Sequence, residues 1–197
     1  MNDSSIQNQP EAYTLIQRAT EAAKFTMPSD KLTCGLLKTL AASKPGGKFL
    51  EFGTETGLST AWILDGMDPS SSLLSFDNDA SLIDIAEQFL GQDTRLSLAV
   101  ADGEDWINEN SEKRFDYIFA DTWHGKYLML DETLDMLKEG GLYILYDMLS
   151  QENWPDGQEE KAEKLVDELG EREDIFLSKL SWATGVIIET KKKSRTL

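Results

Sequence analysis

The sequence predicts an open, doubly wound α/β domain with a helical cap at its N-terminus. Patterns typical of strands and helices alternate from residue 48 onward. Two apolar segments near the C-terminus are separated only by Ser181 and Trp182, so they are expected to pair as a hairpin. The chain has 197 residues, which is the length of one domain.

The residues before position 47 are predicted to form two helices. Apolar residues recur at three- and four-residue steps in the first, at Ala12, Leu15, Ile16, Ala19 and Ala23. Pro28 is expected in the first turn of the second helix, where a missing N–H costs little. Its apolar stripe consists of leucines, at Leu32, Leu36, Leu37 and Leu40. Residues 1–46 therefore form the predicted cap.

The main domain is predicted over residues 47–191, followed by a basic tail over 192–197. Strands are expected at 48–52, 72–76, 95–100, 115–120 and 142–146. Helices are expected at 58–66, 81–90, 103–109, 128–138 and 158–169. This alternation indicates βαβ units, hence a parallel sheet with helices on both faces. The strands at 175–180 and 183–190 add an antiparallel hairpin, because a parallel pair needs a crossover of a dozen residues. The tail is expected to be a frayed end.

Composition and charge exclude several classes of partner. Hydrophobic residues make up 40% and charged residues 28%, as in a soluble globular protein. The net charge of −17 repels phosphate backbones and anionic lipids, so neither nucleic acid nor membrane is expected as a partner. No signal peptide and no membrane span is expected. The single cysteine, Cys34, fits a reducing compartment, and a cytoplasmic location is predicted.

A turn with two glycines follows the first predicted strand, in residues 51–60 (EFGTETGLST). Gly53 and Gly57 allow a tight turn and close approach of a ligand, and the helix that follows directs free N–H groups toward an anion. Glu55 occupies the position where a dinucleotide-binding loop needs glycine, and Glu51 suits a cationic ligand. A plain strand-to-helix turn is the alternative interpretation. If a cofactor binds, one with a carboxylate and cationic groups is favoured over NAD.

Two aspartates at the ends of the next strands are candidate cofactor ligands. Asp77 can accept hydrogen bonds from both hydroxyls of a ribose, whereas Asp79 is expected to be the N-cap of the next helix. Asp102 can accept a hydrogen bond from an adenine amino group or cap the helix that follows it. Both interpretations of Asp102 stay open at this point.

From residue 47 to 191 the chain resembles class I S-adenosylmethionine (SAM)-dependent methyltransferases of the catechol and caffeoyl-CoA O-methyltransferase type. The resemblance rests on four motifs in order, above all residues 115–127 (FDYIFADTWHGKY) and 137–147 (LKEGGLYILYD). It implies a Rossmann-like fold and transfer of a methyl group from SAM to an oxygen of a small-molecule acceptor.

The resemblance also implies roles for particular residues. The methionine end of SAM is assigned to Glu51, Gly53, Gly57 and Ser59, and Thr54 is a further cofactor-binding residue. Asp77 is assigned to the ribose, Asp102 to the adenine, and Trp123 to an apolar wall beside the adenine. These assignments define the predicted cofactor site.

Metal-using members of the family bind a divalent cation such as Mg²⁺ with acids that correspond to Asp121 and Asp147 and with an asparagine directly after the second acid. This chain has Met148 at that place, and a thioether is a poor ligand for a hard cation. Asn153 is a further oxygen donor whose place the sequence does not define. A metal ion is therefore doubtful.

Methyl transfer to oxygen needs a group that takes the acceptor's proton. His124, the only histidine, lies in the loop after Asp121, where the catechol enzymes carry a lysine, and it is the candidate base. Lys126 is the alternate base or a stabiliser of a phenolate, and both are expected to face the acceptor with Asp121.

The predicted function is O-methylation of a small molecule with SAM as the methyl donor. Two alternatives stay open: an NAD(P)-dependent oxidoreductase on a related fold, and a non-catalytic protein that keeps the fold and the cofactor. The oligomeric state is open as well, with a homodimer among the options.

Overall fold

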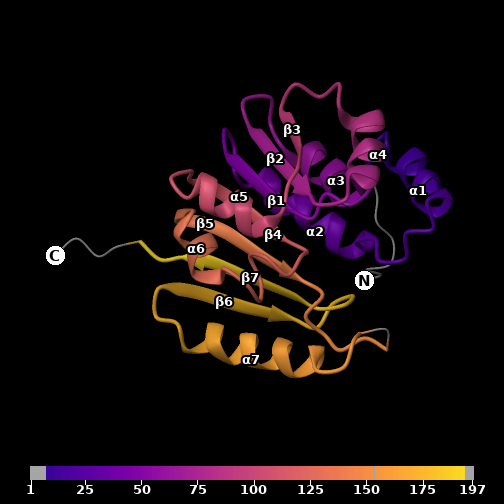
Figure 1. Cartoon of the computed structure of the whole chain (residues 1–197). Helices are drawn as coiled ribbons and strands as arrows, with labels where there is room; N and C mark the ends of the chain where they lie inside the picture. The colour runs from indigo at the N-terminus through magenta and orange to yellow at the C-terminus, as the bar shows by residue number, and fades with distance from the viewer. Residues whose placement is uncertain (1–7, 153, 194–197) are drawn as a thin grey trace. The chain divides into compact units, whose positions relative to one another are not determined.

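The computed structural model describes residues 8–152 and 154–193 (Figure 1). They fall into two compact units, which divide between Asp102 and Gly103. No helix among these described residues has the length and apolarity needed to cross a membrane. The predicted division at residues 46 and 191 stays a prediction, and Ser194 to Leu197 of the predicted tail lie outside the described residues.

The first unit contains a parallel sheet whose strand order is β3-β2-β1. Its strands are β1 (Lys48–Phe52), β2 (Ser72–Asp77) and β3 (Leu96–Val100). Its helices are α1 (Tyr13–Ala22), α2 (Lys31–Ala42), α3 (Leu58–Gly66) and α4 (Ala80–Leu90). Strand β1 is buried from Phe49 to Phe52, as expected for a strand inside a parallel sheet.

The two N-terminal helices pack onto the rest of the first unit. Helix α2 contacts α3, and α1 contacts both α3 and α4. The rings of Tyr13 and Trp62 meet edge to face, with centroids 5.8 Å apart. Trp62 is 1% exposed, so this contact lies in the core of the first unit.

The second unit contains a mixed sheet with strand order β4-β5-β7-β6. Its strands are β4 (Phe115–Ala120), β5 (Leu137–Tyr146), β6 (Ile175–Leu180) and β7 (Val186–Lys191). Its helices are α5 (Gly103–Asn110), α6 (Leu130–Asp135) and α7 (Gln158–Glu171). Strands β4 and β5 are parallel, whereas β7 is antiparallel to both β5 and β6. The predicted C-terminal hairpin is confirmed.

Several element boundaries differ from the prediction, most of them by one or two residues and a few by more. Helix α6 ends at Asp135, and β5 already begins at Leu137 because that residue pairs with Phe115 of β4. Pro28 precedes helix α2 and is not in its first turn, because the Asp30 carboxylate caps the helix by accepting from the N–H groups of Leu32 and Thr33. Strand β7 begins at Val186, since Trp182 and Gly185 close a turn.

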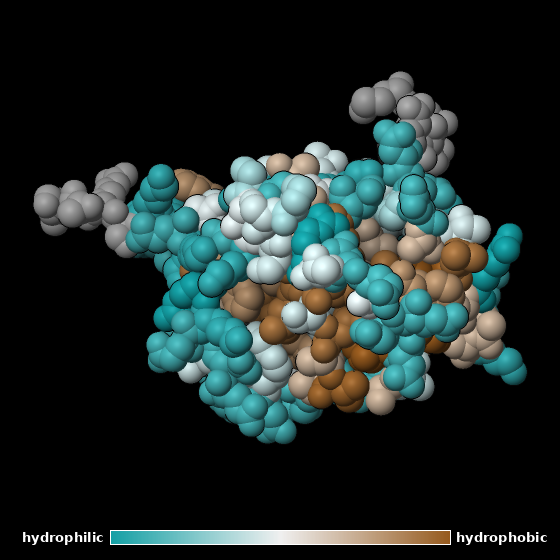
Figure 2. All heavy atoms as spheres, turned by 90° about the horizontal axis from the view of Figure 1, so that it is seen from above, coloured by the Kyte–Doolittle hydropathy of each residue, from teal (hydrophilic) through white to brown (hydrophobic). Residues whose placement is uncertain are grey.

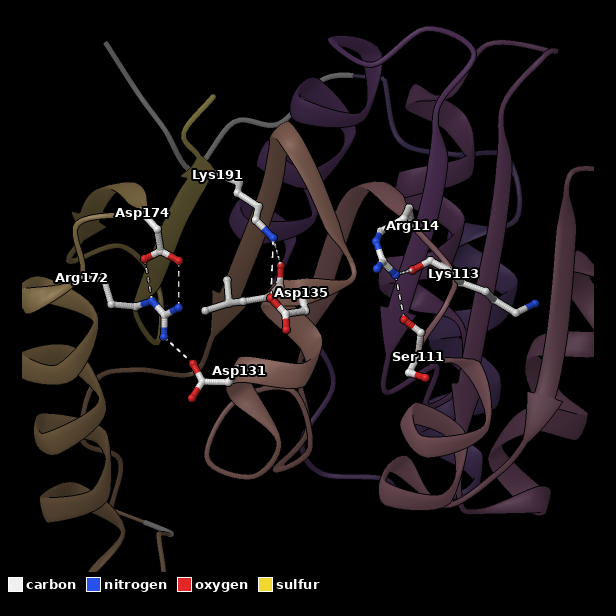
Figure 3. Close-up of polar contacts among 9 residues, drawn as sticks. Ser111, Lys113, Arg114, Asp131, Asp135, Arg172, Asp174 and Lys191 are labelled. Carbon is white, nitrogen blue, oxygen red and sulfur yellow. Dashed lines mark hydrogen bonds and ion pairs between the residues drawn. The ribbon is translucent and has the colours of Figure 1, made fainter. Parts of the chain in front are cut away.

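The surface is largely hydrophilic on the face drawn in Figure 2, with a group of hydrophobic side chains gathered on part of it. In the second unit, ion pairs tie the helices to the hairpin (Figure 3). Arg172 binds Asp131 and Asp174, at 2.5 and 2.9 Å, and Lys191 lies 4.0 Å from Asp135.

Candidate active site

The glycine turn of the first unit is held against strand β2. The N–H groups of Gly53 and Thr54 both donate to the Phe76 carbonyl, at 2.9 and 3.2 Å. Gly53 and Gly57 have φ values of 94° and 92°, a left-handed conformation that favours glycine. A Cβ atom at Gly57 would lie 3.0 Å from Ala86 Cβ, so the turn can approach helix α4 only without a side chain there.

Glu51 is fully buried at the end of β1 and accepts three hydroxyl hydrogen bonds. Ser59 donates to Oε1, and Thr60 and Ser75 donate to Oε2, each at 2.6 Å. Because the Ser75 proton goes to Glu51, the 2.6 Å contact between Thr54 and Ser75 has Thr54 as the donor. Burial raises the pKa of Glu51 to about 7. The hydrogen bonds from the three hydroxyl groups lower this pKa, but burial has the larger effect.

This network brings together three predicted cofactor residues, Glu51, Thr54 and Ser59. Glu51 is 0% exposed, and its carboxylate lies among hydroxyl groups of the chain itself. In this structure Glu51 therefore holds the glycine turn in place. Direct contact between Glu51 and the cofactor stays a prediction. Sequence reasoning missed Ser75 as a partner of Glu51, because Ser75 is 24 residues away from it.

Asp77 fastens the glycine turn to the end of β2. Its Oδ2 accepts from the N–H of Glu55, and its Oδ1 accepts from the N–H of Asp79, both at 3.0 Å. Each oxygen keeps a lone pair for a further donor, and the residue is only partly buried. Asp79 accepts from the N–H of Ser81 at 2.8 Å and caps α4, as predicted.

The residues of the first unit fit a SAM-like cofactor. Helix α3 begins at Leu58 without a side-chain cap, so its first N–H groups are available to a carboxylate. The two carboxylate oxygens of Asp77 are acceptors of the kind that bind ribose hydroxyls. Asp102 is exposed and directly precedes α5. Together these features match a ligand with a carboxylate at one end and a ribose further along.

Lys126 is the central charged residue of the second unit's candidate site. It is 5% exposed, and its ammonium donates to the Tyr146 carbonyl at 2.8 Å. Burial lowers the pKa of Lys126, whereas the charges of Asp121 and Asp147 raise it. The structure thus brings Lys126 together with the two acids that follow β4 and β5.

The surroundings of Asp121 and Asp147 do not fit a divalent cation. The Trp154 indole donates to Asp147 Oδ2 at 3.0 Å, and Met148 is buried at the position of the family's asparagine. The Lys126 ammonium already supplies positive charge to both carboxylates, and it would repel a cation. Among the described residues, no group of three or more His, Cys, Asp or Glu side chains is arranged for a metal. Asn153 lies outside those residues.

His124 lies against the backbone at the start of α5. A Cβ atom at Gly103 would lie 2.5 Å from His124 Cγ, so the imidazole rests directly on this glycine. The backbone carbonyl of His124 accepts from the Thr122 hydroxyl at 3.0 Å, and this bond holds the loop that follows β4. A role of His124 as a base stays a prediction.

A cavity of about 270 Å³ opens between the loop after β4 and helix α7. Its aromatic walls are Trp123 and Tyr127, whose ring centroids are 5.9 Å apart. Trp123 is 45% exposed, and the Lys161 ammonium lies 4.3 Å from its ring centre. Leucines and charged side chains complete the lining, at Leu128, Leu130, Leu165, Lys126, Lys164 and Glu168. Sequence reasoning missed the contribution of α7, for which the only signal was a pair of lysines three residues apart.

Solved structures of similar fold confirm the fold class of the chain. A Corynebacterium glutamicum protein has a TM-score of 0.83 at 18% identity, with 99% of this chain and 95% of that chain covered. The Bacillus cereus O-methyltransferase in complex with SAH has a TM-score of 0.82 at 15% identity, with 96% and 94% covered. The Streptomyces achromogenes O-methyltransferase TomG, involved in tomaymycin synthesis and solved with SAM, also has a TM-score of 0.82, at 17% identity, with 97% and 94% covered. The predicted α/β fold class is confirmed.

The family follows from the sequence match. A model described as a methyltransferase domain matches residues 50–148, and the chain belongs to this family. A search of curated proteins finds no match. The NAD(P)-dependent oxidoreductase alternative is not favoured.

Proposed function

We propose that the protein is a SAM-dependent O-methyltransferase acting on a small molecule. The observation that carries this proposal is the glycine turn braced by Glu51 and Asp77, followed by a helix without an N-terminal cap, in a methyltransferase domain. The solved relatives that hold SAM or SAH support the same cofactor. When bound, SAM supplies a methyl group activated by its sulfonium.

In this proposal the residues of the chain bind and orient the two reactants and stabilise the charge that develops on the acceptor oxygen. The N-terminus of α3 holds the cofactor carboxylate and Asp77 holds the ribose, while Asp102 and Trp123 are assigned to the adenine. The acceptor hydroxyl lies beside the Lys126 side chain. The Lys126 ammonium stabilises the acceptor oxygen while that oxygen loses its proton. Fixing both reactants in place supplies much of the acceleration. The acceptor's O–H bond breaks, an O–CH₃ bond forms, and SAH and a proton are released.

The setting is proposed as well. The protein works in the cytoplasm, a location supported by its one free, buried cysteine, Cys34. Its net charge of −17 supports a small-molecule acceptor and opposes nucleic acid and membrane partners. A homodimer is compatible with this function.

The test of the cofactor site is calorimetry with SAH on the parent protein and on Asp77→Asn. The variant is expected to bind SAH at least about tenfold more weakly, because it loses a charged acceptor for the ribose hydroxyls. Asp84→Asn, at an exposed position of α4, serves as the matched control and should bind SAH as the parent does. Absence of SAH binding to the parent would overturn the proposed function, and equal affinity of Asp77→Asn would remove Asp77 from the site.

A second test concerns the metal. Methyl transfer is expected to change by less than about twofold on addition of EDTA or of Mg²⁺, because Lys126 supplies the positive charge beside Asp121 and Asp147. Initial rates measured on protein freed of metal by dialysis provide the check. Loss of activity in EDTA that Mg²⁺ restores would show that the acids bind a cation after all.

A further inference from the structure

Helix α1 is bonded to the glycine turn through one side chain, Thr20. The hydroxyl oxygens of Thr20 and Thr56 lie 2.7 Å apart, although the two residues are 36 positions apart in the chain. The Thr20 hydroxyl donates its proton to the Ile16 carbonyl at 2.8 Å. Since a hydroxyl has only one proton, Thr56 is the donor in its bond to Thr20. Hydrogen bonds therefore run from the turn, through Thr20, to the backbone of α1.

Water has no access to the bond between the two threonines. Thr20 is 2% exposed and Thr56 is 0% exposed. A buried hydroxyl that loses its partner keeps the full cost of its desolvation, so the Thr56 hydroxyl needs α1 in its place. Packing holds the helix there, because α1 contacts α3 and α4 (Figure 1) and its Ile16 is 0% exposed.

The backbone of the turn is strained at the residue before Thr56. Glu55 has a φ of 50°, a left-handed conformation that residues with a side chain rarely adopt. Such a conformation persists only where the surrounding structure holds it. Two elements hold it here. The Glu55 N–H donates to Asp77 at the end of β2, at 3.0 Å, and the adjacent Thr56 is bonded to Thr20 of α1.

The conformation of this turn decides how the cofactor is held. Thr56 is two residues before the start of α3, so the turn sets the direction in which the first N–H groups of that helix point. The turn is closed by a bond of 2.8 Å from the Gly57 N–H to the Thr54 carbonyl. Molecules in which the turn has another conformation bind the cofactor poorly, so the measured affinity falls with the fraction of molecules that keep it.

We propose that α1 is part of the cofactor site, with Thr20 as the positioning residue that holds the glycine turn in its binding conformation. The inference rests on the proposed function and adds to the site a helix that lies outside the glycine motif. Thr20 acts through Thr56 and needs no contact with the cofactor, because its hydroxyl is already bonded to Thr56 and Ile16.

The test is calorimetry with SAH on the parent and on Thr20→Val, which keeps the shape of the side chain and removes its hydroxyl. The variant is expected to bind SAH about three- to tenfold more weakly, because Thr56 loses its acceptor and the turn loses one of its two supports. Thr20→Ser keeps the hydroxyl and loses a buried methyl group. It should therefore bind SAH within about twofold of the parent even when its melting temperature falls.

Thr33→Val in α2 is the matched control for the loss of a buried hydroxyl. Thr33 is 0% exposed, and its hydroxyl has no hydrogen-bond partner in the part of the chain that the structure describes. The same substitution removes no bond there, so Thr33→Val should bind SAH as the parent does.

A double-mutant cycle shows whether Thr20 acts through Thr56. Thr56→Val removes the donor of the same bond, so adding Thr20→Val to it should weaken SAH binding little further. If Thr20→Val does not fold, Thr56→Val breaks the bond from the side of the turn and carries the same expectation. Amide hydrogen exchange without cofactor gives a second readout. The N–H groups of Glu55 and Gly57 should exchange faster in either variant than in the parent or in Thr33→Val.

Each result distinguishes this inference from the proposed function. Parent-like SAH affinity in Thr20→Val, or an equal loss in Thr20→Ser, would overturn the inference and leave the methyltransferase assignment standing. Additive losses for Thr20→Val and Thr56→Val would also overturn it, because the two residues would then act separately. Failure of the parent to bind SAH would instead contradict the proposed function, and the inference would fall with it.

Discussion

Replacing Lys126 with methionine is expected to lower the turnover of methyl transfer about 10²–10³-fold while SAH still binds. The side chain is buried, its ammonium donates to the Tyr146 carbonyl, and the charges of Asp121 and Asp147 act on it. Methionine has a similar length and no charge, so the substitution removes the group that stabilises the acceptor oxygen. The loss of one preorganised donor has an effect of this size in other enzymes.

Three measurements separate a chemical role of Lys126 from a structural one. Calorimetry with SAH shows whether the cofactor site is intact, and thermal unfolding shows whether the fold is. The split between kcat and KM shows whether the substitution acts in the transition state or on acceptor binding. Full turnover of Lys126→Met with SAH bound would contradict the proposed role.

His124→Gln is the companion variant, because sequence reasoning favours His124 as the base. The imidazole lies against the backbone of Gly103, whereas Lys126 lines the cavity. A smaller loss of turnover is therefore expected for His124→Gln than for Lys126→Met. A loss of equal size, with a pH profile that loses its limb near neutrality, would restore His124 as the base.

Local patterns were sufficient to predict most of the secondary structure. Helix α3 and strands β1, β4 and β6 have the predicted bounds, because their apolar periodicity and flanking turns agree with the final packing. The start of β5 was missed for a tertiary reason. Leu137 continues the helical spacing of α6, but pairing with Phe115 of β4 draws it into the sheet.

The candidate site was predictable only in part. Asp79 could be recognised as the N-cap of α4 from its place between β2 and the helix, whereas the ribose role of Asp77 stays a prediction. The three hydroxyls around Glu51 come from positions 8, 9 and 24 residues away, so the sequence showed a charge but not its burial. Likewise, nothing local indicates that Lys126 is buried.

A second buried acid lies far along the chain from the glycine turn, in the hairpin of the second unit. Glu189 of β7 is 0% exposed and pairs with Tyr143 of β5 in the antiparallel register. Within the described part of the chain, neither of its carboxylate oxygens has a hydrogen-bond partner. Burial raises the pKa of Glu189 to about 8, while Arg172 lowers it and Asp174 raises it slightly. Burial next to Glu189 also raises the pKa of Tyr143 well above its usual value.

Glu189 is therefore expected to make stability fall as the pH rises. An unfolded glutamate ionises near pH 4.5, whereas the folded side chain holds its proton up to about pH 8. The folded state binds more protons in this window, so its advantage is complete below pH 4.5 and is lost as the pH rises through 8. Glu189→Gln keeps the shape without the charge and should be more stable than the parent at pH 9, by on the order of 4 kcal/mol.

Urea unfolding of both proteins at pH 5, 7 and 9 measures this difference, because the pH dependence of all other groups cancels between them. The stability gained by Glu189→Gln should grow from pH 5 to pH 9, since only the parent has to bury a charge at high pH. Glu163→Gln, at an exposed position of α7, is the matched control and should follow the parent at every pH. Parallel curves for the parent and Glu189→Gln would mean that Glu189 is ionised in the folded protein and finds a compensating donor. In that case the ion pairs of Arg172 with Asp131 and Asp174 would have to rearrange toward β7.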